Sequence, residues 1–191
     1  PDASVNSSTH VDDAGSALSP RSMYIDACMR EGINPRASLV LRRGMTKMLD
    51  LSHHGIGDAM GKVLSECILS LPYLQSLNLA DNTLTDASLG PLVAALVQMP
   101  NILHADLSNN VVGDVASNTL STYLGTEICP LVKLVMRNAD VDDFECTRFI
   151  TAIKENKETK LQELDLTQNL LGSAEQLNVV MPELTTAGEA F

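Results

Sequence analysis

Leucine recurs along this chain in a spacing that fits neither a regular helix nor a simple strand. The segment LQSLNLADNTLTD, residues 74–86, has leucine at positions 74, 77, 79 and 84 and asparagine at position 82. The segments LHADLSNNVVGD, residues 103–114, and LQELDLTQNLLGS, residues 161–173, follow the same plan. Side chains of a strand alternate between its two faces, so residues 77 and 79 should point one way and residues 76, 78 and 80 the other. The pattern predicts a short strand in each copy, with leucine facing inward and polar residues facing outward.

The copies recur at a nearly constant period. Aligned on the second leucine-type position, successive copies are separated by 28, 28, 29 and 30 residues, at Leu49, Leu77, Ala105, Leu134 and Leu164. Self-similarity at a period of this length is typical of solenoids, in which each repeat packs only against its neighbours. The chain is therefore expected to contain about five stacked repeats.

A turn and a helix are expected after each strand. Residue types that favour turns and helix N-termini follow in every copy, as Gly57-Asp58, Thr85-Asp86, Gly113-Asp114, Asp142-Asp143 and Gly172-Ser173. The apolar residues that come next are spaced i, i+3, i+4, i+7 and i+8, which predicts one buried helix face at Leu89, Leu92, Val93, Leu96 and Val97. The same helix phase is expected after Asp58, at Val63, Leu64, Cys67, Ile68 and Leu71, and after Asp143, at Phe144, Phe149, Ile150 and Ile153.

This unit of strand, turn and helix resembles the leucine-rich repeat of the ribonuclease-inhibitor type, over about residues 45–181. Such repeats occur in that inhibitor, in the Ran GTPase-activating protein and in NOD-like immune receptors. The resemblance implies an α/β solenoid, a horseshoe segment with parallel strands on the concave face, helices on the convex face and a helical cap at the N-terminal end.

The asparagine of each copy has an expected structural role. A bend after each strand leaves backbone groups inside the solenoid, and stacked amides can form hydrogen bonds to the turns on both sides. Asn82, Asn110 and Asn169 fill this position. His54 is expected to substitute for the amide in the first copy, whereas Ala139 should leave a looser or water-filled position in the fourth.

Three domains are expected along the chain. Residues 1–20 are small and polar, which predicts a disordered lead. Residues 21–44 are expected to form a helical cap, with Ser22 capping one helix and Asn34-Pro35 opening a second. Residues 45–191 are assigned to the repeat domain, with an enlarged fifth loop at 170–188 and a further helix beginning near Thr185. We expect a truncated array whose open C-terminal end favours self-association; a tail that folds back as a cap is the alternative.

Charge and cysteine usage limit the classes of partner. The chain has 24 acidic and 13 basic residues, a formal net charge of −11, which disfavours nucleic acid and favours a partner with a basic surface. No apolar run approaches the roughly 20 residues of a membrane span. The four cysteines form no CxxC pair, so free thiols and a cytoplasmic location are expected. A basic cluster, Arg36, Arg42, Arg43 and Lys47, is either a solvated helix face or a docking site for an acidic neighbour.

No arrangement of residues predicts a reaction. His53, His54 and His104 have no acid, cysteine or serine at a spacing that a metal site or a nucleophile requires, and the chain has no glycine-rich phosphate loop. The sequence therefore predicts a protein that is not an enzyme and that uses neither a cofactor nor a metal.

The candidate functional surface is the outward face of the strands. Asp50, Asp106 and Asp165 recur at one outward position, where they could receive a basic partner or fix local turns of the frame. Departures from the frame mark the partner-binding residues, which are predicted to be His104, Asp106, Lys133, Val135, Arg137, Glu163 and Asp165. The expected function is a protein-protein interaction module or scaffold. A GTPase activator resembling the Ran regulator and a structural part of a ciliary or cytoskeletal assembly remain alternatives.

Overall fold

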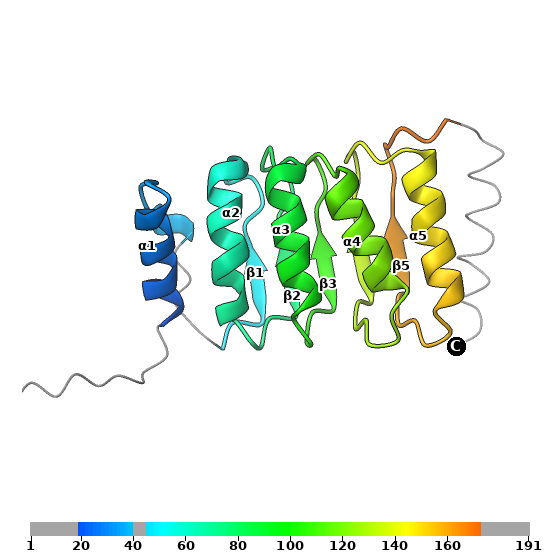
Figure 1. Ribbon diagram of the computed structural model, residues 1–191, viewed down its shortest axis with the longest axis horizontal. Helices are drawn as coiled ribbons and strands as arrows, with labels where there is room; N and C mark the ends of the chain where they lie inside the picture. Colours follow the sequence, from blue (N-terminus) through cyan, green and yellow to red (C-terminus); the bar gives the residue numbers. More distant parts are fainter. Residues whose placement is uncertain (1–18, 40–44, 173–191) are drawn as a thin grey trace, which may run out of the picture.

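The computed structural model describes residues 19–39 and 45–172. Most of the predicted lead, the end of the predicted second cap helix at 40–44, and the predicted enlarged loop and further helix beyond residue 172 lie outside the described residues. The described residues form a curved row of strands lined on one side by helices (Figure 1).

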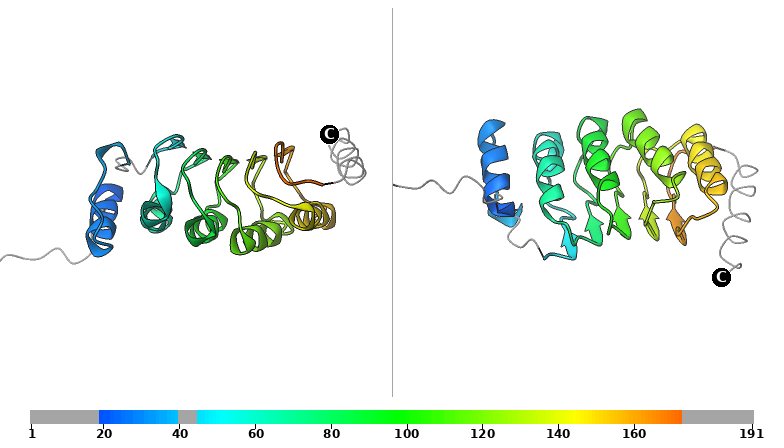
Figure 2. Two further views of the ribbon diagram at one scale, coloured as in Figure 1. Left: turned by 90° about the horizontal axis from the view of Figure 1, so that it is seen from above. Right: turned by 60° about the horizontal axis from the view of Figure 1, so that its bottom comes forward.

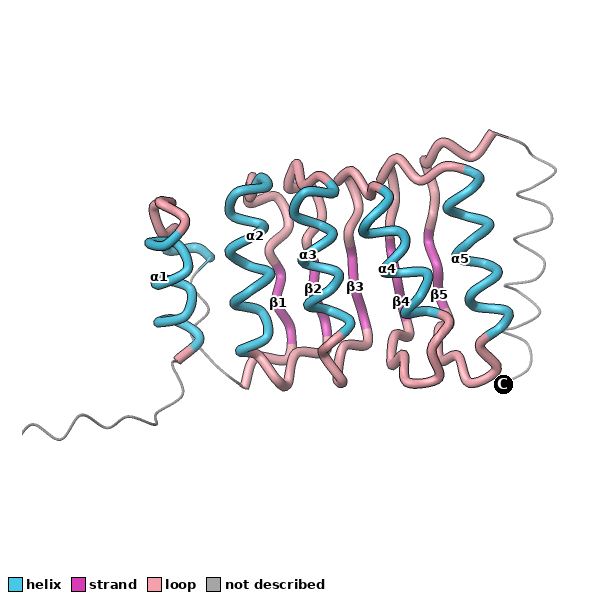
Figure 3. Tube along the Cα trace, in the orientation of Figure 1, coloured by secondary structure: helices cyan, strands magenta, loops and turns pink. Residues whose placement is uncertain are grey.

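Five short strands form one parallel sheet, in the order in which they occur in the chain (Figure 3). They are β1 (Met48–Asp50), β2 (Ser76–Asn78), β3 (His104–Asp106), β4 (Lys133–Val135) and β5 (Glu163–Asp165). The register pairs equivalent repeat positions, so that Leu49 lies opposite Leu77, and Leu77 opposite Ala105. The predicted strands and the predicted period are thereby confirmed.

One helix follows each of the first four strands and returns the chain to the start of the next. These helices are α2 (Gly57–Cys67), which a 3-10 turn (Ile68–Ser70) extends, α3 (Asp86–Val97), α4 (Asp114–Leu124) and α5 (Asp143–Glu155). They lie side by side along the face opposite the strands, as the end-on and tilted views show (Figure 2). The α/β solenoid expected from the sequence is therefore the observed fold.

The core is a stack of leucine-rich layers between the strands and the helices. Leu74, Leu77 and Leu79 are at most 1% exposed, whereas the equivalent leucines of the fifth repeat are only half-buried. The predicted buried face of α3 is confirmed, except that Val97 is only partly buried. The prediction was wrong for Phe144, whose side chain is 68% exposed. Its apolar character suggested the core, but the buried apolar side chains of α5 begin two residues later, at Cys146.

The amide of Asn82 satisfies the turns on both sides of it. Its Oδ1 accepts hydrogen bonds from the backbone N–H groups of His54 and Ile56 in the preceding repeat, at 3.0 and 3.3 Å. Its Nδ2 donates to the carbonyl oxygens of Leu51 and Leu79, both at 2.8 Å. The predicted asparagine ladder is confirmed. Its hydrogen bonds join turns of neighbouring repeats, which are far apart in the sequence.

The ladder continues through two further asparagines and changes at Ala139. Asn110 Oδ1 accepts from the Leu84 N–H at 3.0 Å, and Asn169 Oδ1 accepts from the Ala139 N–H at 2.8 Å. At the ladder position of the fourth repeat, the backbone carbonyl of Ala139 accepts a hydrogen bond at 3.0 Å from the Val112 N–H of the third repeat, to which an asparagine side chain would otherwise bond. Ala139 is fully buried. The turn thus closes with a direct backbone hydrogen bond at the position predicted to be loose.

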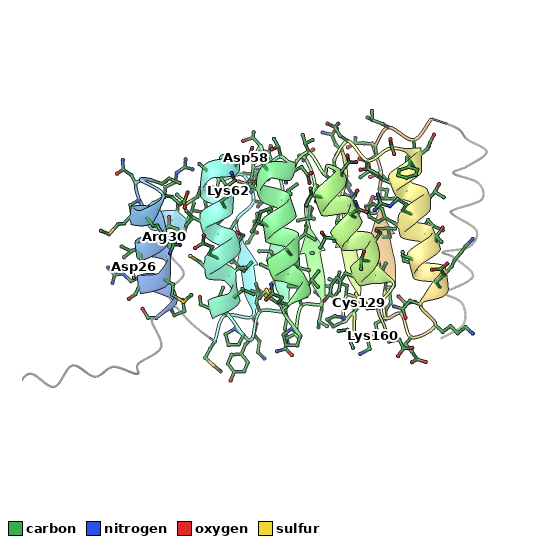
Figure 4. All side chains as sticks on the ribbon, in the orientation of Figure 1. Asp26, Arg30, Asp58, Lys62, Cys129 and Lys160 are labelled. Atoms are coloured by element: carbon green, nitrogen blue, oxygen red, sulfur yellow. The ribbon has the colours of Figure 1, made fainter. Side chains whose placement is uncertain are left out.

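Helix α1 (Pro20–Arg30) lies against α2 at the N-terminal end of the array. Ser19 is its N-cap, and Ser22, the predicted cap, donates its own N–H to the Ser19 Oγ at 3.2 Å. The sequence Ser19-Pro20 favours this earlier start because proline fits the first helical position. Arg30 forms an ion pair with Glu66 of α2, which ties the two helices together (Figure 4).

The segment after α1 is held against the first repeat mainly by Tyr24 and Arg36. The fully buried Tyr24 hydroxyl accepts a hydrogen bond from the Arg36 N–H at 2.9 Å. The Arg36 side chain donates to the carbonyl oxygens of His54 and Gly55, at 3.2 and 2.8 Å. Arg36 is therefore a structural tie, which neither interpretation of the basic cluster anticipated. The predicted second cap helix is, within the described residues, only the 3-10 turn Ala37–Leu39, because its expected first turn at Asn34-Pro35 is not helical.

Candidate partner-binding surface

The strands present two columns of side chains on their solvent-facing side. In β2 and β3 the middle residue is buried and its neighbours are at least partly exposed, whereas in β4 Val135 is buried together with the middle residue, at 6% exposure. The register places Met48, Ser76, His104, Lys133 and Glu163 in the first column, and Asp50, Asn78, Asp106, Val135 and Asp165 in the second. Six of the seven predicted partner-binding residues have positions in these columns, although the side chain of Val135 is buried, and Arg137 follows two residues after the end of β4. The fold brings the predicted set together on one face.

Two ion pairs cross between the fourth and fifth repeats on this face. Lys133 Nζ lies 2.7 Å from Glu163 Oε1, and Arg137 Nε donates to Asp165 Oδ2 at 2.6 Å. Partial burial opposes ionisation of Asp165, but the hydrogen bonds from Arg137 and Thr167 outweigh it and lower the pKa of that carboxyl. The hydrogen bond to Asp165 also raises the pKa of Arg137. The two cations and two carboxylates of this part of the surface thus largely balance each other's charge.

The acidic column also has the structural role that the alternative interpretation predicted. In four repeats the second-column side chain accepts, through Oδ1 at 2.9 to 3.0 Å, a hydrogen bond from the N–H two residues later, in the pairs Asp50–Ser52, Asn78–Ala80, Asp106–Ser108 and Asp165–Thr167. Val135 has no such acceptor, and the Arg137 N–H donates instead to the Ser108 Oγ of the preceding repeat at 3.1 Å. One oxygen of each carboxylate is used locally, and the other oxygen of Asp165 pairs with Arg137, so within the described residues the second oxygens of Asp50 and Asp106 are the ones left for a partner.

Comparison with known proteins agrees with this geometry. The family model described as Leucine Rich repeat matches residues 70–93. The chain is 30% identical over 160 residues to the NACHT, LRR and PYD domains-containing protein 5 of Mus musculus, covering 81% of this chain and 13% of that protein. It is 31% identical over 127 residues to the ribonuclease inhibitor of Sus scrofa, covering 66% of this chain and 27% of that protein.

The repeat period, the register and these relatives together decide the family. The chain is a leucine-rich repeat protein of the ribonuclease-inhibitor type. The chain covers only about an eighth of the length of the mouse protein and about a quarter of the length of the pig inhibitor. The solved structure of the tropomodulin C-terminal domain of Caenorhabditis elegans superposes with a TM-score of 0.61 at 16% identity, covering 87% of this chain and 94% of that one. At that identity the likeness shows the fold alone.

Two of the three histidines in the described repeats form hydrogen bonds within the repeat frame. His53 Nδ1 lies 2.6 Å from Asp81 Oδ2, and His54 Nδ1 lies 2.7 Å from the Ser52 carbonyl oxygen, so His54 replaces part of the ladder amide as predicted. His104 is exposed in the first column. Across the described residues, no group of three or more His, Cys, Asp or Glu side chains could hold a metal ion, and no helix is long and apolar enough to cross a membrane.

The sequence analysis did not identify a row of exposed residues, one in each repeat, that comes directly before the ladder position. In every repeat the residue before the ladder position has a left-handed backbone, with φ between 46° and 63°, at His53, Asp81, Asn109, Asn138 and Gln168. Neighbouring residues in this row contact each other, as in the His53–Asp81 pair. A usable signal was present, because each of these positions holds a polar residue, and asparagine and aspartate tolerate positive φ best.

Proposed function

We propose that this chain is a protein-protein interaction module, or scaffold, that binds a protein partner on its concave face and loop edges without catalysis of its own. The observation that carries the proposal is the regular sheet whose outward residues differ from repeat to repeat. The proposed contact residues are His104, Asp106, Lys133, Val135, Arg137, Glu163 and Asp165. The ribonuclease inhibitor, as its name states, acts on another protein, which supports a similar use of this face.

The charge of the face favours a partner with a basic surface. Asp106 forms no ion pair within residues 19–39 and 45–172. Acidic side chains outnumber basic ones along the two columns and the loops that follow them. The acidic residues are Asp50, Asp81, Asp106, Glu163 and Asp165, and the basic residues are Lys133 and Arg137. A rigid support adds to the affinity of such a surface, because little conformational entropy is lost when a partner binds. The asparagine ladder and the buried leucine layers supply that rigidity.

The proposal is tested by quantitative affinity capture with two charge-reversal variants. Lys133→Glu/Arg137→Glu breaks both ion pairs on the concave face, whereas Lys157→Glu/Lys160→Glu makes the same change of charge at exposed positions off the strands. We expect the recovery of specific partners to change by about tenfold or more with the first variant, because it replaces two contact residues and makes the face more acidic, and to be retained with the second. Circular dichroism melting of both variants controls for folding.

Equal recovery of every partner with both variants would contradict the proposed surface. Stimulation of GTP hydrolysis by the wild-type chain, in an assay with small GTPases, would instead support the GTPase-activating alternative. That assay therefore separates a binding module from a regulator that acts on a bound nucleotide hydrolase.

A further inference from the structure

A second surface lies at the edge where the strands lead into the helices. Four large apolar side chains are exposed there, in the last three described repeats: Val111 (42%), Val115 (56%), Phe144 (68%) and Leu170 (65%). This edge is the upper one in Figure 1. We call these four residues the rim patch. It is separate from the two columns of the concave face.

At one repeat position, the rim patch has larger apolar side chains than the first two repeats have. The residue ten positions after the middle of each strand is Ala59 and Ala87 in the first two repeats, but Val115 and Phe144 in the next two. The frame itself therefore needs only a small side chain here. Exposed apolar groups that the fold does not require are expected to act in contacts with another molecule.

The patch residues are held in fixed positions. The Arg148 guanidinium lies over the Phe144 ring, 5.5 Å from its centroid, and also donates to Ser121 Oγ at 3.3 Å. Val115 lies over Gly90, where a Cβ atom would come within 2.8 Å of the valine side chain. The Leu170 N–H donates to a backbone carbonyl of the adjacent loop at 3.0 Å. A pre-organised apolar surface loses little entropy on binding.

Acidic side chains surround the patch. Asp114 directly precedes Val115 in the sequence. Asp140 lies in the loop after β4, which is between the loop that contains Val111 and the loop that contains Leu170. The backbone of Asp142 pairs with that of Leu170 in an isolated parallel bridge. All three aspartates are exposed, and none forms an ion pair within the part of the chain that the structure describes. A partner that covers the apolar side chains must place opposite charge beside these carboxylates.

We propose that the rim patch binds a partner segment in which an apolar side chain is flanked by lysine or arginine. The apolar side chain covers Phe144 and Val115, and the flanking cations pair with Asp114 and Asp140. This surface supplies a second contact that is independent of the concave face. A partner engaging both would bind more tightly than through either alone.

The experiment uses a displayed library of random peptides as its probe. The full chain is immobilised, peptides are selected on it, and enriched sequences are synthesised and titrated against variants. Phe144→Ser and Val115→Ser remove apolar surface, and Asp114→Asn/Asp140→Asn removes charge without touching Asp142, which caps α5. Ile128→Ser is the matched control, because Ile128 is 84% exposed and lies beyond the opposite end of α4.

We expect enriched peptides that combine a leucine or aromatic residue with lysine or arginine. Their affinity should fall by about tenfold with Phe144→Ser and several-fold with the double aspartate variant, and should remain unchanged with Ile128→Ser and with Lys133→Glu/Arg137→Glu. Insensitivity to the concave variant keeps this result distinct from the proposed function.

Several outcomes would overturn the proposal. Absence of enrichment above background, enriched peptides without basic residues, or equal binding to Phe144→Ser would each do so. Sedimentation that shows concentration-dependent dimers of the wild type, lost in Phe144→Ser, would identify a second copy of the chain as the occupant and would likewise refute a basic partner segment.

Discussion

At the scale of single residues, the ladder position shows how one side chain can set the shape of a repeat. Asparagine has both an acceptor and two donors, so one amide can serve N–H groups in one turn and carbonyl groups in two. Asn82 does this with its side chain fully buried. Ala139 shows the alternative, in which the backbone closes on itself and the position loses its side-chain bonds. The amide therefore fixes the spacing of the turns as well as their hydrogen bonds.

Asn82→Ala should destabilise the fold by roughly 3 kcal/mol, because several buried backbone groups would lose their partner at once. Chemical denaturation followed by circular dichroism measures the change in the free energy of unfolding. Asn101→Ala is the control, since the Asn101 side chain is exposed and donates a single hydrogen bond, to the Pro72 carbonyl at 2.9 Å. A loss for Asn82→Ala no larger than that of the control would show that the ladder does not stabilise the turns.

At the scale of elements, a carboxylate in the first turn of one helix caps the next helix. Asp58 of α2 accepts hydrogen bonds from the Thr85 N–H at 2.8 Å, from Thr85 Oγ1 at 2.7 Å and from Ser88 Oγ at 2.6 Å (Figure 4). Asp86 of α3 accepts in the same way from the first turn of α4. Negative charge at a helix N-terminus is favourable, and here it also joins adjacent repeats.

The Asp58 contacts predict a pH-dependent stability. Partial desolvation opposes ionisation of Asp58, but the hydrogen bonds from Ser88 and Thr85 outweigh it and lower its pKa below the ordinary value of 3.8. A carboxyl whose pKa is lower in the folded state stabilises the fold above its unfolded pKa, and the stabilisation is lost as the pH falls through the folded pKa.

Asp58→Asn should therefore cost about 1 kcal/mol at neutral pH, and the difference from wild type should shrink below about pH 4. Denaturant titrations at several pH values measure it. Asp114→Asn is the matched control, because Asp114 occupies the same repeat position, nine residues after the middle of its strand, but is exposed. If both variants lost the same stability at every pH, the bridge between repeats would contribute nothing.

At the scale of the whole molecule, the stacked layers isolate the interior from solvent. All four cysteines, which lie in α1, α2, α5 and the segment before β4, are free and buried. Burial raises the pKa of the Cys67 thiol to about 12 and also raises the pKa of Cys129 and Cys146. Since the thiolate is the reactive form, these groups should be unreactive in the folded protein.

Thiol labelling should therefore report the opening of the fold. We expect no cysteine of the native protein to react with a chromogenic disulfide reagent at neutral pH, and all four to react once denaturant unfolds the chain. Mass spectrometry of the labelled protein counts the modified thiols and identifies them. Rapid labelling of one native cysteine would show that its repeat opens locally.

The sequence alone determined the repeat number, the strands, most of the helices and the asparagine ladder. Each repeat contacts only its neighbours, so a pattern that is repeated about every 28 residues specifies both the unit and the surface on which the next unit packs. The same regularity predicted that His104, Asp106, Lys133 and Glu163 share one face, which the register confirms.

Only the tertiary structure decided which side chains meet across that regular frame. The Lys133–Glu163 pair and the Asp58 bridge depend on distances between residues 27 or more positions apart, which no local period encodes. Phe144 fits the apolar pattern in type but lies outside the buried stripe of α5, because the exact rotation of a helix is set by packing against its neighbours. Periodicity therefore fixed the scaffold, and through-space contacts between repeats fixed the chemistry of its surface.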